Sequence, residues 1–401
     1  MLELLLVGVA LQGSRDSLTL DAALALARAN RGQIAAAAAQ VAAARADFRV
    51  AGALPNPVAS YQYTGDPPRQ HVTVDQPLDW LLRRPGERAA ARAGIGAALA
   101  DSTLLTAQVE REARNAFYAA VGAARRLALV EEEAALADSL AAIASRRHAA
   151  GEISEWERAQ ARLEAARARQ LVSSGREERA LAVAELGRAL GTAAETLPPL
   201  AGALDSDVSL SLPPAPPTDD LPFVARARAD SAAAGAQHRA AQWSRVPVPD
   251  FQAGVEWSDP SASVQRATIL IGLSLPLPLW QSRGAAAAAA GARADQAFAR
   301  LREVRAEAAS VLAQTAVRIR EAALRAVVAR DSILPLAGRQ RELALAAYRA
   351  GETGIVPVLD ALRAERQVAR DMVADLIAYQ QALADWLALV AGTVLKGRDE
   401  Q

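Results

Sequence analysis

Apolar residues recur at helical spacing over most of the chain, whereas two short regions alternate apolar and polar residues. The alternation predicts four strands in two pairs, at 58–64 with 70–78 and at 251–258 with 266–275. Elsewhere, apolar positions three, four and seven residues apart, with Arg and Glu between them, predict the seam of a coiled coil or helix bundle. The clearest such stripe is Leu301, Val304, Ala308, Val311, Leu312, Ile319, Ala323 and Val327.

Two of the predicted helices are far longer than an ordinary globular helix. Residues 87–148 contain no proline, and residues 284–348 contain only Pro335, which we expect to kink the second rod because it removes a backbone donor. Gly151 and Gly351 follow these rods, and we expect each glycine to end its rod in a left-handed turn. Each rod therefore predicts a helical hairpin with a sharp tip.

Shorter helices complete the prediction. Ala-rich helices begin near Leu18, with Thr19 or Asp21 as cap, are interrupted at Gly32 and end near Pro55. A further helix spans 223–244. Return helices follow the two tips, over 155–190 with Ser154 as cap and over 358–389.

The second half of the chain repeats the first at an offset of about 200 residues. The strand exit 76–80 corresponds to 275–280, the tip 148–152 corresponds to 348–352, and the closing Leu190-Gly191 corresponds to Ala391-Gly392. This spacing predicts a duplicated architecture. The predicted domains are a signal-like or disordered N-terminus (1–17), a first repeat (18–195), a Pro-rich connector (196–222), a second repeat (223–392) and a C-terminal tail (393–401).

Composition narrows the function classes. Of 401 residues, 52% are hydrophobic and only 4% aromatic, which suits long, closely packed helices. The 45 basic residues balance the 45 acidic ones, so no nucleic-acid surface is predicted. We find no metal-spaced His/Cys cluster, phosphate-binding Gly loop or nucleophile elbow, and we expect no enzyme activity and no cofactor or metal. His71, His148 and His238 are expected to be surface or packing residues.

The strands favour contact with lipid. Val72 and Val74 alternate with polar neighbours, and Asp75 and Glu256 are expected to face a polar lumen with the apolar set outward. A half-exposed soluble sheet produces the same alternation and stays open as an alternative. Four strands are too few for a barrel, and unpaired edges in lipid are prohibitively costly. Two chains would supply eight strands and a filled interior, so three chains are the smallest symmetric solution with a channel.

Several motifs resemble the TolC family of outer-membrane efflux channels. They are Leu-Thr-Leu-Asp-Ala-Ala-Leu-Ala-Leu-Ala (18–27), Leu-Pro-Asn-Pro (54–57), Tyr-Arg-Ala-Gly-Glu (348–352) and Val-Leu-Asp-Ala (358–361). The resemblance runs from about residue 18 to residue 392 and includes Pro335. It implies a mainly helical fold, with a periplasmic α-barrel of long hairpins and four strands per chain in a homotrimeric twelve-stranded outer-membrane β-barrel.

The resemblance also implies a function and partners. The chain is expected to be a passive export conduit of a tripartite efflux or type I secretion system, located in the outer membrane among its lipids. A periplasmic adaptor (membrane fusion) protein and an inner-membrane pump are the implied protein partners. The alternative is a soluble periplasmic coiled-coil scaffold or adaptor. An adaptor would carry one helical hairpin between small β domains, whereas this sequence predicts two hairpins and two strand pairs.

Candidate site residues follow from this comparison. Adaptor docking is predicted at the tips, at Gly151, Glu152, Gly351 and Glu352, and a pore constriction at Asp360. Pairing of Asp360 with an Arg such as Arg363 on an exposed helix surface is the open alternative. The remaining candidates are the strand-to-helix prolines Pro77 and Pro276 and the following aromatics Trp80 and Trp280, either at the membrane interface or in ordinary packing.

Two features depart from the family pattern. Some relatives carry a lipid on an N-terminal Cys, whereas this chain has no cysteine. Some members carry two acidic residues at the start of the last long helix, and the matching positions here are Pro357 and Asp360. A double ring of carboxylates is therefore not expected.

Overall fold

The computed structural model describes residues 17–66, 69–205, 208–209, 211, 215–257, 267–275 and 283–394. Residues 1–16 of the predicted signal-like N-terminus and most of the predicted C-terminal tail lie outside this part of the chain. The chain divides into two compact units. One comprises the chain up to Ile34, Leu104–Pro216 and the chain from Ala309 onward, and the other comprises Ala35–Thr103 and Pro217–Ala308. Each unit therefore combines parts of both predicted repeats.

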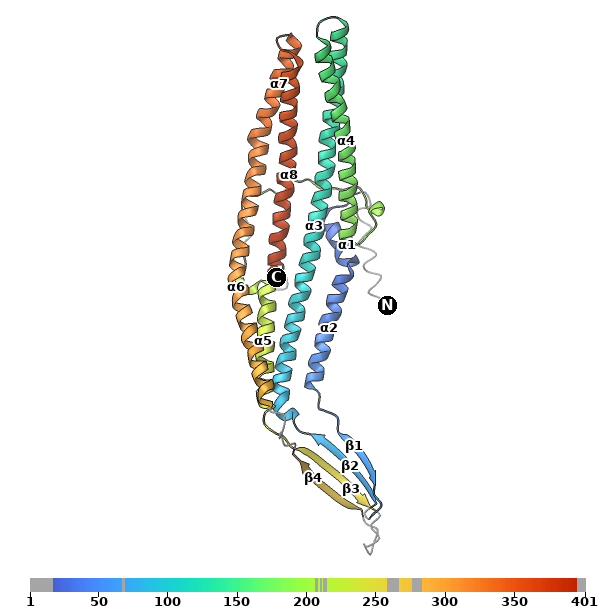
Figure 1. The fold of residues 1–401 in the computed structure, drawn as a ribbon, viewed down its shortest axis with the longest axis vertical. Helices are drawn as coiled ribbons and strands as arrows, with labels where there is room; N and C mark the ends of the chain where they lie inside the picture. The colour runs from blue at the N-terminus through green and yellow to red at the C-terminus, as the bar shows by residue number, and fades with distance from the viewer. Residues whose placement is uncertain are drawn as a thin grey trace. The chain divides into compact units, whose positions relative to one another are not determined.

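The four strands form one antiparallel sheet in the order β1-β2-β3-β4 (Figure 1). Their bounds are β1 Val58–Tyr63, β2 Gln70–Pro77, β3 Asp250–Trp257 and β4 Thr268–Ser274. β1, β2 and β4 are one to three residues shorter than the predicted runs, and β3 is shifted from its predicted run by one residue. The central pairing joins β2 to β3, so residues about 180 positions apart in sequence become neighbours, as in the pair Val72 and Val255.

Five helices connect to this sheet or continue from it. The first strand pair is preceded by α1 (Leu20–Asn30) and α2 (Gly32–Gly52) and followed by α3 (Trp80–Ala149). The second pair is preceded by α5 (Pro222–Trp243) and followed by α6 (Arg283–Val328). The hydroxyl of Thr19 accepts a hydrogen bond from the amide of Ala22, so Thr19 is the predicted cap of α1.

The predicted start of the first rod was wrong. α3 is 70 residues long and begins at Trp80, so Pro85 lies inside the helix and does not precede it. A proline near a helix start leaves few carbonyls without partners. The backbone amides of Leu81, Leu82 and Arg83 also bond back to Leu78 and Asp79, which nucleates the helix before Pro85 is reached.

Pro335 coincides with a local change of helix type. Between α6 and α7 (Leu334–Ala350), residues Ala329–Ile333 form a single π turn, and Pro335 lies in the first turn of α7. The π turn is a recognised cause of helix irregularity. The structure thus has a π turn directly before the proline, and the kink itself stays a prediction.

The return helices are α4 (Glu155–Leu190) and α8 (Ile355–Val394). Ser154 caps α4 in a reciprocal capping box with Glu157, as predicted. Short 3-10 turns at Ala194–Thr196 and Thr218–Asp220 are the described regular elements of the connector. In the first unit, a buried core joins α1, α3, α4 and α8 through side chains such as Leu24, Phe117, Leu186 and Val373.

The predicted apolar stripe of the second rod is its buried face. Leu301, Ala308, Ile319 and Ala323 are buried, and the other four members are half-buried. No helix in the described part of the chain is long and apolar enough to cross a membrane.

Candidate functional site

The register of the sheet sorts its side chains into two chemically different faces. Residues directly opposite one another on neighbouring strands project to the same side. Tyr61 pairs with Val72, Val72 with Val255, and Val255 with Ile269. The apolar face comprises Ala59, Tyr61, Tyr63, Val72, Val74, Phe251, Ala253, Val255, Ile269, Ile271 and Leu273, with Gln70, Gln76 and Trp257 at its ends.

The apolar face is open in the single chain. Ile269, Ile271 and Leu273 on β4 are 75%, 71% and 70% exposed, and Tyr61 is 63% exposed. Contiguous apolar surface of this kind marks contact with another protein or with a membrane. Scattered single apolar residues would need no such explanation.

The opposite, polar face carries hydrogen-bonded side chains. Ser60 and Thr73 hydroxyls lie 2.6 Å apart, and His71 Nδ1 lies 2.9 Å from Glu256 Oε1. Asp75 lies on this face as well, opposite Val58 and Gln252. The sequence prediction that Asp75 and Glu256 share one face, with the valines on the other, agrees with the observed register. The remaining members of this face are Gln62, Pro77, Asp250, Gly254, Thr268, Leu270, Gly272 and Ser274.

The strand-to-helix transition is described for the first half only. Pro77 is the last residue of β2 and Trp80 the first of α3. The Trp80 ring is half-buried, lies 5.7 Å from the Arg84 guanidinium carbon, and has a buried Nε1 without a hydrogen-bond partner. Pro276 and Trp280 lie outside the described residues.

Both hairpin tips have the same backbone conformation. Gly151 and Gly351 have φ of 76° and 78°, the left-handed region that favours glycine. The amide of Glu152 donates to the carbonyl of Arg147, and the amide of Glu352 donates to that of Ala347. These six-residue closures are Schellman motifs, which end a helix and reverse the chain.

The tips also touch each other. The Arg147 guanidinium carbon lies 4.9 Å from the centre of the Tyr348 ring, and Arg147 Nε lies 2.9 Å from Glu152 Oε2. Hydrogen bonds to Glu152 and Tyr348 raise the pKa of Arg147 above its ordinary value. Below them, a buried cluster that includes Leu140, Tyr348 and Ile355 joins the two hairpins.

Comparison with known proteins explains this combination of a two-faced sheet and long hairpins. Residues 221–392 match the family model described as outer membrane efflux protein. This segment of the chain is therefore similar to outer membrane efflux proteins. Among curated protein sequences, no significant relative was found.

Solved structures share the fold over almost the whole chain. A membrane protein from Pseudomonas aeruginosa is 20% identical, with a TM-score of 0.79 and coverage of 92% of this chain and 93% of its own. CusC is 18% identical, with a TM-score of 0.79 and coverage of 92% and 91%. The CmeC outer membrane channel of Campylobacter jejuni is 16% identical, with a TM-score of 0.76 and coverage of 95% and 88%. At these identities, the likeness establishes the fold.

In this fold, Asp360 is an exposed residue of α8. Its Oδ1 lies 3.0 Å from Arg363 Nη1, and its side chain is 62% exposed. The pairing matches the alternative left open by the sequence. A role for Asp360 in a constriction stays a prediction, since that role depends on neighbouring copies.

Sequence reasoning missed the ionic seam that fastens α8 to the other hairpin. Arg363 Nε lies 2.9 Å from Glu164 Oε1 on α4, and Arg370 Nη1 lies 2.9 Å from Glu133 Oε2 on α3. Hydrogen bonding to Arg363 holds the pKa of Glu164 below its ordinary value, against the opposing effect of burial. Alternating Arg and Glu occur throughout the helices, so no sequence signal distinguishes these partners.

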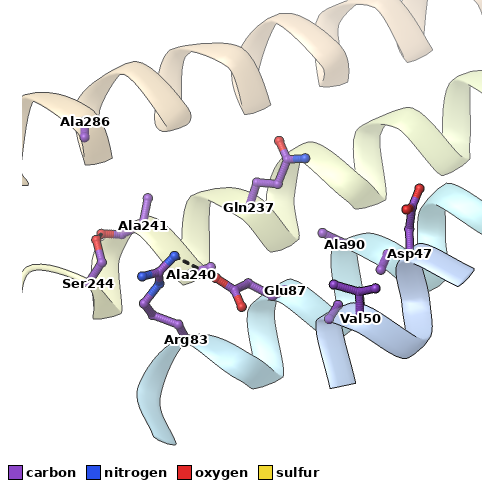
Figure 2. Close-up of a pocket in the computed structure, with 12 residues that line it drawn as sticks. Asp47, Val50, Arg83, Glu87, Ala90, Gln237, Ala240, Ala241, Ser244 and Ala286 are labelled. Carbon is purple, nitrogen blue, oxygen red and sulfur yellow. Dashed lines mark hydrogen bonds and ion pairs between the residues drawn. The ribbon is translucent and has the colours of Figure 1, made fainter. Parts of the chain in front are cut away.

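A second feature missed from the sequence is a cavity of about 840 Å³ between α2, α3, α5 and α6 (Figure 2). Asp47, Arg83, Glu87 and Gln237 place polar groups on its otherwise Ala-rich walls, and Arg83 pairs with Glu87 at 2.9 Å. Among the described residues, no cluster of three or more His, Cys, Asp or Glu side chains is placed to hold a metal ion.

Proposed function

We propose that the chain is the outer-membrane channel component of a tripartite efflux system and forms a passive conduit for small molecules. The two-faced sheet carries this proposal, because one face is apolar and open while the other is polar and hydrogen-bonded. A membrane barrel with a watery interior needs this alternation. The family match of residues 221–392 supports the same conclusion.

A homotrimer completes the barrel. Strands β1 and β4 each have one strand partner among the described residues, so the sheet has two free edges. Free edges are not tolerated in lipid. Pairing β4 of one copy with β1 of the next closes the sheet, and three copies give about twelve strands, enough for a channel.

The helical region has matching free faces. Large apolar side chains remain exposed on α4 and on α6–α7, which belong to different hairpins of the first unit. They are Trp156, Leu163, Leu171 and Leu181 on α4, and Val317, Leu324, Val328, Leu336 and Leu343 on α6–α7. Many of these positions are seven or eight residues apart, as at a coiled-coil seam. Packing α4 of one copy on α7 of the next covers both stripes.

The partners and the location follow from the conduit. A passive conduit needs an external energy source, so in this proposal an inner-membrane pump drives transport. A periplasmic adaptor connects the pump to the hairpin tips and binds at Gly151, Glu152, Gly351 and Glu352. The tunnel lies in the periplasm and the sheet in the outer membrane. The scaffold alternative is less suited to the open apolar face of the sheet.

Membrane fractionation and single-channel recording test the proposal together. The full chain is expressed in a Gram-negative host, extracted and reconstituted in planar bilayers. We expect detergent-dependent extraction with the outer membrane, a trimer by native mass spectrometry, and conductance. A monomer that is released without detergent and conducts nothing would rule out a channel.

A further inference from the structure

A small apolar groove lies between the start of α3 and the end of α5. Its volume is about 330 Å³, and its lining includes Leu81, Leu82, Pro85 and Ala89 of α3 and Arg239 and Trp243 of α5. The α3 residues recur at intervals of about four, so they form one stripe along the helix. The groove is therefore a continuous apolar strip with one arginine beside it.

Its position is fixed by the chain on either side. α3 begins three residues after the end of β2, and α5 ends shortly before the start of β3. The groove residues therefore occupy the turns of helix next to the sheet. If the sheet spans the outer membrane, this level is the boundary between acyl chains and headgroups.

The groove is open rather than packed. Leu81 is 53% exposed and Trp243 is 55% exposed, although both are large and apolar. Tryptophan is enriched at membrane interfaces because its ring is apolar and its N–H is polar. The apolar face of the sheet, next along the chain, is open in the same way.

The contact between α3 and α5 separates this groove from the larger cavity of Figure 2. The helices approach closely there, since a Cβ on Gly86 would lie 2.7 Å from that of Ala240. Arg83 and Glu87 line the cavity, whereas Pro85 and Ala89 line the groove. The Arg83–Glu87 ion pair thus lies on the cavity side of this helix pair, and Leu81 and Leu82 lie on the groove side.

Arg239 supplies the charge at the groove. Its side chain is exposed and forms no ion pair with any residue that the structure describes. A guanidinium group is the preferred protein partner of phosphate, because its N–H groups match two oxygens at once. An unpaired arginine beside an open apolar strip is complementary to an amphiphile with a phosphate headgroup.

We propose that this groove binds a phospholipid of the surrounding bilayer, with an acyl chain along Leu81, Leu82 and Ala89 and the phosphate on Arg239. The inference rests on the proposed membrane location of the sheet. It adds a lipid site at the foot of the helical region, distinct from general wetting of the barrel surface. In this proposal the Trp243 ring lines the groove next to the headgroup.

Native mass spectrometry of the full chain tests the site. Delipidated protein in detergent is titrated with phosphatidylglycerol, and bound lipids are counted per chain. Arg239→Gln removes the phosphate contact, and Ala89→Leu fills the strip. Loss of one charge-assisted contact is expected to weaken the tightest binding step about fivefold or more. Arg245→Gln, at another exposed arginine near the same helix end, is the matched control and should bind as the unmodified chain does.

Three outcomes would overturn the lipid site: equal binding by the Arg239→Gln and Arg245→Gln variants, no effect of Ala89→Leu, or full displacement of lipid by millimolar inorganic phosphate. The same samples are scored for oligomer mass and conductance. A conducting trimer that binds no lipid at the groove refutes this inference alone. Absence of both oligomer and conductance refutes the channel itself.

Discussion

Arg363 on α8 and Glu164 on α4 are 199 residues apart in sequence, yet Arg363 Nε lies 2.9 Å from Glu164 Oε1. The Glu164 side chain is only 13% exposed, while that of Arg363 is 43% exposed. Arg363 also holds Asp360. One guanidinium group thus links the two hairpins and the predicted constriction residue.

The pair predicts a pH-dependent stability. The pKa of Glu164 is lower in the folded chain than its ordinary value of 4.5. Glu164 therefore stabilises the fold fully at pH values above 4.5, and this contribution is lost as the pH falls through the folded pKa. Glu164→Gln should cost about 1–2 kcal/mol at pH 7, between exposed and buried pairs. Thermal unfolding followed by circular dichroism at pH 7 and pH 3 measures the difference, which should shrink in acid.

Glu185→Gln is the control for that measurement. Glu185 pairs with Arg188 within α4, and both side chains are more than half exposed. Glu185→Gln should change the midpoint of thermal unfolding far less than Glu164→Gln does. A Glu164 variant that behaves like the Glu185 variant at both pH values would show that the inter-hairpin pair adds no stability.

The two sheet faces predict opposite responses to charge. Val255→Arg places a cation on the apolar face and should cost about 2–4 kcal/mol near mid-bilayer, which reduces assembled oligomer in the outer membrane. Gln252→Arg places the same charge on the polar face and should assemble normally. Heat-modifiable mobility on gels and native mass spectrometry measure assembly. Equal yields from the two variants would contradict the assignment of the faces.

The tips predict a docking defect that depends on backbone conformation. Apart from the adjacent residues in the chain, no described atom lies within 4 Å of a Cβ added at Gly151 or Gly351, so substitution there acts through the positive φ. Gly351→Val should strain the turn by about 1–3 kcal/mol and weaken crosslinking to the adaptor. Gly351→Asn tolerates this conformation and should retain docking. If Val prevents oligomer assembly before it affects docking, the glycine has only a structural role.

Asp360 and Arg363 predict opposite shifts in ion selectivity if Asp360 faces the pore. Asp360→Asn removes a ring of like charges and should lower cation preference. Arg363→Gln leaves the Asp360 carboxylate without its ion-pair partner and should raise the cation preference. Reversal potentials under a salt gradient in planar bilayers measure both. Two unchanged potentials with an intact oligomer would place Asp360 outside the pore.

The exposed stripes predict a specific contact between copies. Leu163 lies about three turns past the first tip and Leu336 about four turns before the second, so level tips would bring them to similar heights. The chain has no cysteine, so Leu163→Cys with Leu336→Cys introduces the only thiols. Oxidation should give crosslinked oligomers. The pair Leu163→Cys with Glu342→Cys, which moves one thiol off the stripe, should crosslink far less.

The sequence alone determined the order and type of the elements. Local geometry decides these features, so they can be read from the sequence directly. Examples are the turns at Gly151 and Gly351, the helix caps Thr19 and Ser154, and the apolar–polar alternation in the strands. The start of α3 was misplaced because backbone bonds upstream of Pro85 outweighed the local signal of the proline.

Only the tertiary structure decided which distant residues meet. The β2–β3 register brings His71 to Glu256, and the helix packing brings Arg363 to Glu164 and the α3 strip to Arg239. Charged residues of both signs occur every few positions along these helices, so many pairings are equally compatible with the sequence. The choice among them depends on how the helices and strands pack, because an ion pair or a groove forms only where the backbone places its parts within a few ångströms.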